Sequence, residues 1–132
     1  MERAYPSQSK KPPSRHVRGR RAEAVAADYF FASGFVPLGA NVRAGPLELD
    51  LIVEQGDLLV VVEVRSRKRS ALETALESVR PKKQAQVQRA TAALWRKSIQ
   101  TRTHLQRVRY DVITVSFEGG RVELEHIESA FG

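Results

Sequence analysis

Cysteine is absent from this chain of 132 residues, and methionine and tryptophan occur once each. Without cysteine the chain has no disulfide, no thiolate zinc site and no cysteine nucleophile, and such a composition is typical of a reducing compartment. Long apolar runs are also missing: no stretch approaches the roughly twenty residues of a membrane span, and the N-terminus lacks the apolar segment of a signal peptide. We therefore expect a cytoplasmic protein that contacts no membrane.

Acidic residues are few relative to basic ones, and the formal net charge is +7 at pH 7. Residues 1–21 hold seven basic residues against one acidic residue, whereas residues 22–132 are nearly balanced. Within that balanced part, residues 65–109 carry thirteen Lys or Arg against two Glu. A basic segment of this density favours a polyanion such as nucleic acid as the partner. A solvated face together with a basic arm is the plainer interpretation, and the charge pattern leaves both open.

The chain divides into two parts by composition. Residues 1–16 are rich in Pro, Ser, Lys and Arg and poor in apolar residues. Such a segment buries too little apolar surface to offset the entropy of ordering, so we expect a disordered basic N-terminal arm. Residues 17–132 carry the regular hydrophobic patterns, and their length is that of one ordinary domain. We predict a single domain over 17–132.

Hydrophobic periodicity predicts an α/β domain with a central mixed β-sheet flanked by helices. The first hairpin is expected to turn at Gln55-Gly56 and the second at Gly119-Gly120. The expected elements are, in chain order, a helix over 17–33, a strand around 35–42, a hairpin over 47–53 and 58–64, a short helix that opens with a capping box at Ser70 and Glu73, a helix over 81–98, and a hairpin over 107–117 and 121–127.

The strand LELDLIV alternates apolar and acidic residues, which predicts one face made of Leu47, Leu49, Leu51 and Val53. With Gln55-Gly56 as the turn, Glu48 on the other face lies opposite Glu63, and Asp50 lies diagonal to it. Arg65 shares the side of Glu63, because successive side chains alternate across a strand. Three carboxylates and one guanidinium are therefore expected to converge on one patch of the sheet.

Glu63 lies inside an apolar strand, where an unpaired carboxylate is costly or becomes protonated. It therefore needs a cation, a set of hydrogen-bond donors or a metal ion. An ion pair with Arg65 or Arg109 is one solution. A divalent cation is the other, and carboxylates without cysteine or paired histidine favour Mg²⁺ or Mn²⁺ over zinc. The histidines are widely separated and are expected to be ordinary loop or surface residues: His16, His104 and His126.

The motifs form a set in the order of a known family: Glu23 in the first helix, Asn41 and Arg43 before the hairpin, LELDLIV and VVVEVRSR within it, Lys83-Gln84 opening a helix, and RYDVI at 109–113. Over residues 17–116 the chain resembles the YraN-like, endonuclease-related family of the PD-(D/E)XK nuclease superfamily. The resemblance implies a restriction-endonuclease-like core, akin to that of Holliday junction resolvases, with DNA as the substrate.

The resemblance also implies a site. Asp50 and Glu63 match the two acidic residues of the nuclease motif and would hold the metal ion. Glu23 matches a first-helix glutamate that helps to build the metal site in resolvase-like relatives. Glu48 matches a further glutamate of the family, as a ligand, a support of the site or the partner of an arginine. Arg65 stands at the position where the motif has lysine.

Two residues depart from the family pattern. Leu47 replaces the glycine before the glutamate, so the entry into this strand can differ. A lysine at position 65 could lose or share a proton, whereas the guanidinium of Arg65 stays protonated and only donates hydrogen bonds. Arg65 can position water or stabilise the developing phosphorane charge, but it cannot be the general base.

Contacts to the nucleic-acid backbone are expected from residues of the basic segments and the family motifs: Arg43, Arg67, Lys82, Lys83 and Gln84. Lys83-Gln84 is equally compatible with a solvated first helical turn. Asp111 matches the strand aspartate of the family, and a structural role beside Arg109 is favoured for it.

Two functions follow from these patterns. The first is a Mg²⁺- or Mn²⁺-dependent endonuclease that hydrolyses phosphodiester bonds in structured or branched DNA. The second, motivated by Arg65, is a catalytically degenerate nucleic-acid-binding protein that retains the nuclease fold. A protein-interaction module with a purely structural acidic cluster is a third and weaker interpretation. A homodimer is compatible with the sequence, which does not decide the oligomeric state.

Overall fold

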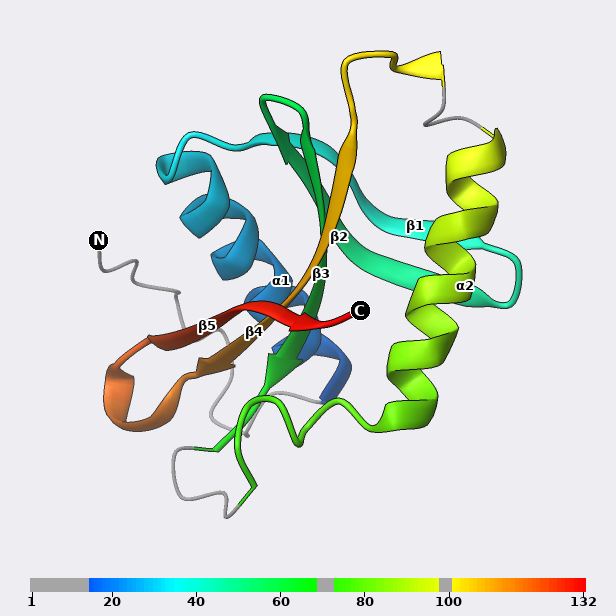
Figure 1. The fold of residues 1–132 in the computed structure, drawn as a ribbon. Coiled ribbons are helices and arrows are strands. Elements are labelled where there is room, and N and C mark those ends of the chain that lie inside the picture. Colours follow the sequence, from blue (N-terminus) through cyan, green and yellow to red (C-terminus); the bar gives the residue numbers. More distant parts are fainter. Residues whose placement is uncertain (1–14, 69–72, 98–100) are drawn as a thin grey trace.

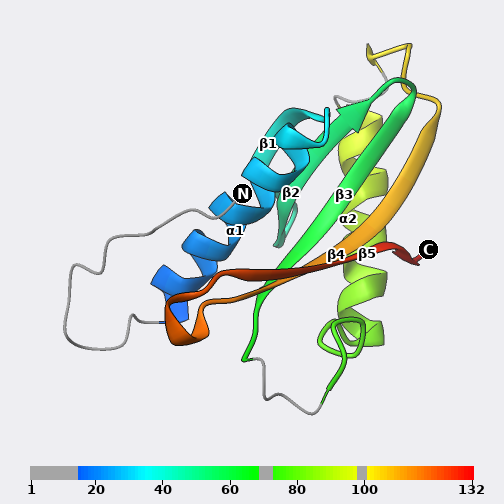
Figure 2. The ribbon, with the colours of Figure 1, turned by 90° about the vertical axis from the view of Figure 1, so that its left-hand side faces the viewer.

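The computed structural model describes residues 15–68, 73–97 and 101–132, and for residues 15–18 it describes the backbone alone. The expected arm at 1–16 thus lies almost wholly outside the described residues. The described residues form one five-stranded β-sheet with a long helix against each face (Figures 1 and 2). Neither of these helices is long and apolar enough to cross a membrane.

The sheet is mixed, as the hydrophobic pattern predicts. Its strand order is β1-β2-β3-β4-β5, in which β3 and β4 are parallel and every other neighbouring pair is antiparallel. This arrangement confirms the α/β fold class and fits a restriction-endonuclease-like core. The elements are α1 (Arg15–Ala32), β1 (Val36–Ala44), β2 (Leu47–Gln55), β3 (Leu58–Ser66), α2 (Pro81–Lys97), β4 (Arg107–Ser116), a short 3₁₀ turn (Glu118–Gly120) and β5 (Glu123–Phe131).

Each face of the sheet has its own apolar core. On the α1 side, small alanines at four-residue spacing bring the helix close to the strands, and Phe30 fills the space beyond them. That cluster comprises Ala22, Ala26, Phe30, Leu51, Val53, Val60, Val62, Ile113 and Val115. On the α2 side, the buried cluster comprises Leu49, Ile52, Leu59, Val61, Val87, Ala90 and Leu105. The two clusters place β2 and β3 between the helices, covered on both faces.

The turn of the first hairpin differs from the prediction. Gln55 pairs with Leu58, so the turn is Gly56-Asp57, and Gly56 occupies its first position with a φ of 60°. Glycine adopts this left-handed conformation without strain. The register therefore shifts by two, with Leu51 opposite Val62. The predicted pairing of Glu48 with Glu63 is wrong, because continuing this register brings Asp50 opposite Glu63.

The alternation of β2 also breaks at Asp50. Leu49 packs in the cluster on the α2 side, whereas Leu51 packs on the α1 side. Asn41 of the neighbouring strand β1 has a left-handed φ of 52° at the same level, between the pairs Ala40–Leu51 and Val42–Leu49. The prediction that Leu47, Leu49, Leu51 and Val53 share one face is therefore wrong, because the chain twists at Asp50.

The segment before α2 also differs from the prediction. Residues 73–80 form turns rather than the predicted helix, and Ser70 lies outside the described residues. The reciprocal capping contacts belong to the next possible pair: Thr74 N donates to Glu77 Oε1 at 2.8 Å, and Glu77 N donates to Thr74 Oγ1 at 3.1 Å. The turn ends where Pro81 begins α2.

Candidate functional site

Glu63 is the buried charge at the centre of the site. It lies on β3, on the α2 side of the sheet, and only 1% of its surface is exposed. Its Oε1 is 3.6 Å from Nζ of Lys83, which comes from the first turn of α2. Its Oε2 is buried and has no hydrogen-bond partner among the residues that the structure describes. An unpartnered carboxylate oxygen in a protein interior is costly, so a ligand for this atom is expected.

Asp50 is the second carboxylate and lies within hydrogen-bonding reach of Glu63. The paired residues of β2 and β3 end at Leu51 and Val62, and beyond that point Asp50 Oδ2 accepts a hydrogen bond from Val64 N at 2.9 Å. The Asp50 side chain therefore takes the place of a ladder bond. The pairing of β2 with β1 and β3 fixes the backbone around Asp50, and the bond from Val64 N fixes its side chain. Asp50 is therefore held in place at the end of the ladder.

The electrostatics of the pair follow from burial. Burial raises the pKa of Glu63 to about 8, and the nearby charge of Asp50 adds to this effect. Burial also raises the pKa of Asp50, although the hydrogen bond from Val64 N opposes the change. The charges of Lys83 and Arg65 act on both carboxylates and favour their ionised forms. A bound divalent cation would act in the same direction and more strongly.

Glu23 and Glu48 lie apart from Glu63. Burial raises the pKa of Glu23, a hydrogen bond from Asn41 opposes this, and the charges of Asp50 and Glu48 raise it further. Glu48 is exposed and lies opposite Arg43 of β1 in the strand ladder. Within the described residues, no three Asp, Glu or His side chains form a group that could hold a metal ion. The predicted convergence of Glu48, Asp50 and Glu63 is thus wrong, and the structure brings together the pair Asp50 and Glu63.

This pair fits a hard divalent cation. Both groups are oxygen donors, and Glu63 Oε2 has no hydrogen-bond partner among the described residues. Mg²⁺ commonly takes only one or two carboxylates in phosphate-processing sites, with water and substrate phosphate as its remaining ligands. Two carboxylates are therefore a sufficient protein donor set. Glu23 as a further ligand stays a prediction.

The expected phosphate contacts fall into different environments. Lys83 lies against Glu63 rather than in open solvent. Gln84 donates its amide to Val79 O at 2.9 Å, and Arg67 donates to the backbone carbonyl of Glu73, so both are held within the protein. The other two are exposed on the surface: Arg43 and Lys82.

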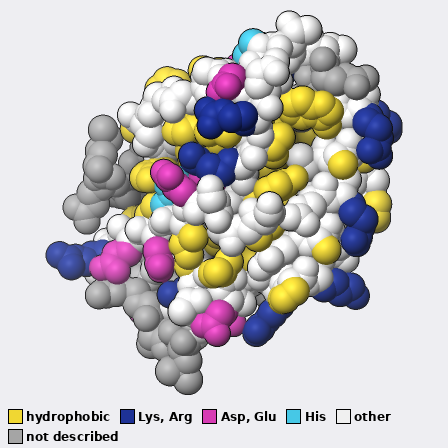
Figure 3. Space-filling view, in the orientation of Figure 1, with side chains coloured by type: hydrophobic (Ala, Val, Ile, Leu, Met, Phe, Trp, Pro, Cys, Tyr) yellow, Lys and Arg dark blue, Asp and Glu magenta, His cyan; other side chains and the backbone are white. Residues whose placement is uncertain are grey.

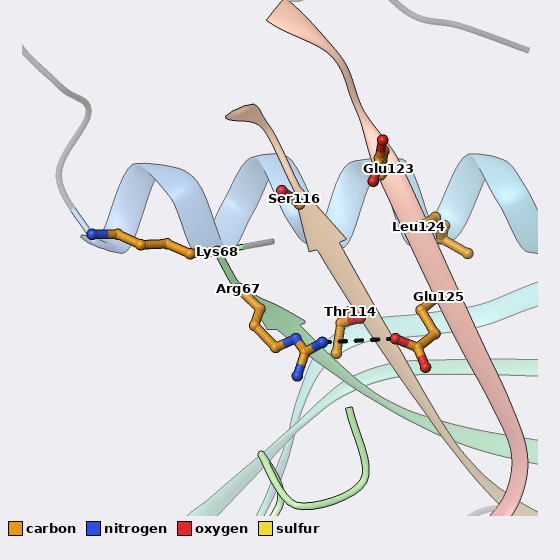
Figure 4. Close-up of a pocket in the computed structure, with 7 residues that line it drawn as sticks. All are labelled: Arg67, Lys68, Thr114, Ser116, Glu123, Leu124 and Glu125. Atoms are coloured by element: carbon orange, nitrogen blue, oxygen red, sulfur yellow. Dashed lines mark ion pairs between the residues drawn. The ribbon is translucent and has the colours of Figure 1, made fainter. Parts of the chain in front are cut away.

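A small pocket lies on the same face of the sheet as Glu63. It has a volume of about 190 Å³ and is lined by Arg67 and Lys68, which follow β3, and by residues of β4 and β5. Arg67 and Glu125 point toward one another across β4, with 3.8 Å between Nη2 and Oε2 (Figure 4). Thr114, beside Arg65 in the parallel ladder, and the unpartnered Oγ of Ser116 also line it. The pocket therefore extends the polar surface beyond the carboxylate pair.

The surface around α2 is basic. Lys and Arg side chains follow the side of the molecule that this helix forms (Figure 3). The exposed ones on α2 are Lys82, Arg89, Arg96 and Lys97. Since Lys83 starts from the same helix, the carboxylate pair lies beside this basic surface.

A second polar network lies on the opposite face, and sequence reasoning found only its pair Asp111 and Arg109. Asp111 is fully buried and accepts hydrogen bonds from Arg109 Nε and Nη2, both at 2.8 Å, and from Ser129 N. His126 Nε2 is 2.7 Å from Asp111 Oδ2, and its Nδ1 is 2.8 Å from the Tyr29 hydroxyl. The predicted pairing of Asp111 with Arg109 is confirmed.

The expectation that His126 is a surface or loop residue is wrong. It lies on β5 with 10% of its side chain exposed. The signal was present in the sequence, because Val122, Leu124 and His126 alternate along one face of this strand. His104 is exposed, as expected, and contacts Glu54 at 3.2 Å. The side chain of His16 lies outside what the structure describes.

Residues 22–115 match the model of the family described as "Uncharacterised protein family UPF0102". The chain belongs to this family. It is 43% identical over 112 residues to a UPF0102 protein of Bordetella avium, covering 84% of this chain and 73% of the relative. It is 40% identical over 114 residues to a UPF0102 protein of Frankia casuarinae, covering 86% and 94%. A UPF0102 protein of Sorangium cellulosum is 33% identical over 119 residues, covering 89% and 83%.

UPF0102 is the YraN-like family that the sequence motifs indicate. The family description and the relatives' names state no activity, substrate or metal. Family membership is therefore established by comparison, whereas the chemistry of the UPF0102 site rests on the geometry of this chain.

Proposed function

We propose that this UPF0102 protein is a metal-dependent endonuclease that hydrolyses phosphodiester bonds in structured or branched DNA. The observation that carries the proposal is the buried Glu63, whose Oε2 has no partner although it lies beside a second carboxylate, Asp50. A hydrolase that uses Mg²⁺ or Mn²⁺ needs such a pair, and it needs a basic surface for the polyanion nearby.

The residues divide the chemistry between them. Asp50 and Glu63 would hold Mg²⁺ or Mn²⁺, which when bound polarises the scissile phosphate and lowers the pKa of a bound water. Arg65 follows Glu63 on the same side of β3, and its fixed positive charge stabilises the charge that develops on the phosphorane oxygens. The water oxygen forms a bond to phosphorus and the bond to the leaving oxygen breaks. One proton of the water passes to the leaving oxygen, which gives a phosphate monoester and a hydroxyl.

DNA binding in this proposal uses charge rather than base readout. Lys82 and Arg43 are exposed and can reach phosphate oxygens, and Lys82 is one of the exposed basic residues of α2. Contacts of this kind position a duplex without reading its sequence. A cytoplasmic location, where bacterial DNA lies, is part of the proposal.

A second candidate is a DNA-binding protein that has kept the fold and lost turnover. Arg65 is the observation that favours it, because a guanidinium does not exchange a proton with water near neutral pH. The basic surface would serve this function equally well. Binding without hydrolysis is what separates it from the first candidate.

The test incubates purified protein with linear, nicked and four-way-junction DNA in Mg²⁺ or Mn²⁺. Wild-type protein should cleave at least one substrate, and Asp50→Asn and Glu63→Gln should each abolish cleavage because each removes a ligand charge. Glu118→Gln, an exposed change in the 3₁₀ turn, is the matched control and should cleave normally. Cleavage that persists in both ligand variants rejects this site, and binding with no cleavage by any form supports the second candidate.

A further inference from the structure

The two carboxylate oxygens of Glu63 have different surroundings. Oε1 is 3.6 Å from the ammonium of Lys83, whereas Oε2 has no partner. The oxygens of one carboxylate lie only about 2.2 Å apart, so an ion bound at Oε2 would have Lys83 as a near neighbour. The structure thus places an ammonium beside a buried carboxylate oxygen that has no hydrogen-bond partner among the described residues.

The position of Lys83 is unfavourable for the helix itself. It is the third residue of α2, whose first turn contains no acidic residue. A cation near the positive end of the helix macrodipole is destabilising rather than stabilising. Helix stability therefore does not explain this lysine, whereas its contact with Glu63 does.

Lys83 is also poorly placed as a simple phosphate contact. Its side chain is only 31% exposed and is directed to Glu63, while the adjacent Lys82 is exposed. A side chain that binds the DNA backbone at the surface would resemble Lys82. The prediction of the same role for both residues thus does not match their different environments.

We propose that Lys83 is the catalytic ammonium of this site, which donates hydrogen bonds to the attacking water and to the scissile phosphate beside Glu63. This role rests on the nuclease function proposed above. It completes a set in which Arg65 supplies a fixed planar guanidinium and Lys83 a compact ammonium with three rotating donors. The ammonium comes from α2, since the next residue of β3 on the same side as Glu63 is Arg65.

Lys83→Met tests the role and keeps most of the side-chain volume. We expect kcat to fall by about 10²- to 10³-fold, as on removal of a donor that stabilises transition-state charge. The affinity for DNA in Ca²⁺ should change by less than about twofold, since Lys83 is not one of the exposed backbone contacts. Arg121→Met, an exposed change directly after the 3₁₀ turn and outside the basic surface of α2, should leave both quantities unchanged.

A rescue experiment separates a catalytic ammonium from a structural one. Arg65→Lys, made in the Lys83→Met protein, places an ammonium on β3 on the same side as Glu63. We expect kcat to recover at least about tenfold, because an ammonium is restored beside Glu63 and position 65 keeps its positive charge. Full activity of Lys83→Met, a loss of DNA affinity in place of kcat, or a double variant no faster than Lys83→Met would each overturn the assignment.

Metal binding gives a readout that does not depend on turnover. Calorimetry with Mn²⁺ should show binding to wild-type protein and equal or tighter binding to Lys83→Met, because the ligand atom Oε2 is kept and a neighbouring positive charge is removed. If wild-type protein binds no Mn²⁺ and Lys83→Met gains a site, the ammonium is a built-in replacement for the ion, and the catalytic role is wrong.

Failure of the proposed nuclease function and failure of the role proposed for Lys83 give different results. Absence of DNA cleavage by wild-type protein counts against the nuclease function, whereas cleavage that does not depend on position 83 counts against Lys83 alone. Circular dichroism checks the fold of each variant. If Lys83→Met does not fold, Lys83→Gln replaces it with the same expected loss of kcat.

Discussion

At the residue scale, Asp50 and Glu63 each leave water on folding, which raises the cost of ionising them, and the charge of Asp50 raises that cost further for Glu63. The effect is largest for Glu63, because burial moves its pKa from 4.5 to about 8. In the absence of metal the folded protein therefore keeps a proton on this group that the unfolded chain loses. This difference links protein stability to pH.

The free energy of unfolding of the metal-free protein should fall as pH rises. Near pH 4 and below, Glu63 is protonated in both states and has no effect. Between pH 4.5 and about 8 the folded state binds the extra proton, so each increase in pH favours the unfolded chain, and above about 8 the loss is complete. Urea unfolding at pH 5 and at pH 8, with a chelator present to remove metal ions, measures this fall in the free energy of unfolding. Glu63→Gln is the control, because it cannot titrate.

The stability of wild-type protein relative to Glu63→Gln should thus be lower at pH 8 than at pH 5. A relative stability that stays constant or rises with pH would show that Glu63 is already ionised in the folded metal-free protein. Asp50, whose pKa is also raised by burial, acts in the same direction and does not reverse the sign.

Sequence reasoning located some of the site and missed the rest for physical reasons. Asp50 and Glu63 were found because charges inside apolar strands require an explanation. The contact between Lys83 and Glu63 could not be predicted, because it depends on the path of the chain between β3 and α2. No hydrophobic period determines that path. Glu48 was misplaced because the turn uses Gly56 in its first position, which shifts the register.

At the element scale, the twist in β2 sets which carboxylates meet. Leu49 and Leu51 pack on opposite sides of the sheet, so Asp50 lies at the point where the strand changes its orientation. Asn41 of β1 adopts a left-handed φ of 52° beside this point and donates a hydrogen bond to Glu23. Asparagine tolerates this conformation better than most residues with a side chain.

Substitutions at Asn41 test whether the left-handed backbone matters. Asn41→Gly loses the amide that bonds Glu23 but keeps the conformation, whereas Asn41→Ala loses the amide and adds strain. We expect Asn41→Ala to be less stable than Asn41→Gly by roughly 1 kcal/mol in urea unfolding. Equal stability of the two variants would mean that the strand relaxes to an ordinary extended conformation.

The order and type of the long elements could be predicted from the sequence, because their apolar residues repeat with a clear period. The observed α2 (Pro81–Lys97) matches the predicted helix to within one residue, since Pro81 fixes where it begins. The break at Asp50 could not be predicted, because LELDLIV is an unbroken alternation and the twist arises from packing on both faces. The short helix predicted from Ser70 onward is replaced by turns over 73–80, in which Thr74 and Glu77 make reciprocal hydrogen bonds.

At the scale of the whole molecule, the two faces of the sheet have different characters. The α2 face carries the carboxylate pair, its cations and the polar pocket. The α1 face carries the closed network of Asp111, Arg109 and His126, in which every carboxylate oxygen has a partner. The satisfied network is explained by stability, whereas the pair with an unpartnered oxygen is explained by a ligand.

DNA binding should weaken steeply with salt, because contacts to phosphate release counterions. For duplex DNA the logarithm of the affinity falls with the logarithm of the salt concentration, with a slope of about −0.9 for each contact. Lys82→Ala removes one exposed contact and should make the slope shallower by about 0.9. Arg121→Ala is the charge-matched control, since Arg121 is exposed after the 3₁₀ turn and does not belong to the basic surface of α2. A slope unchanged by Lys82→Ala would remove this residue from the interface.

The central claim is that Asp50 and Glu63 together hold a divalent cation. Titration calorimetry of the full chain with Mg²⁺ or Mn²⁺, for the wild type, Asp50→Asn and Glu63→Gln, tests it most directly. We expect a binding isotherm for the wild type and none for either variant, with Glu118→Gln behaving as the wild type. No metal binding by the wild type, or unaltered binding by both ligand variants, would contradict the account.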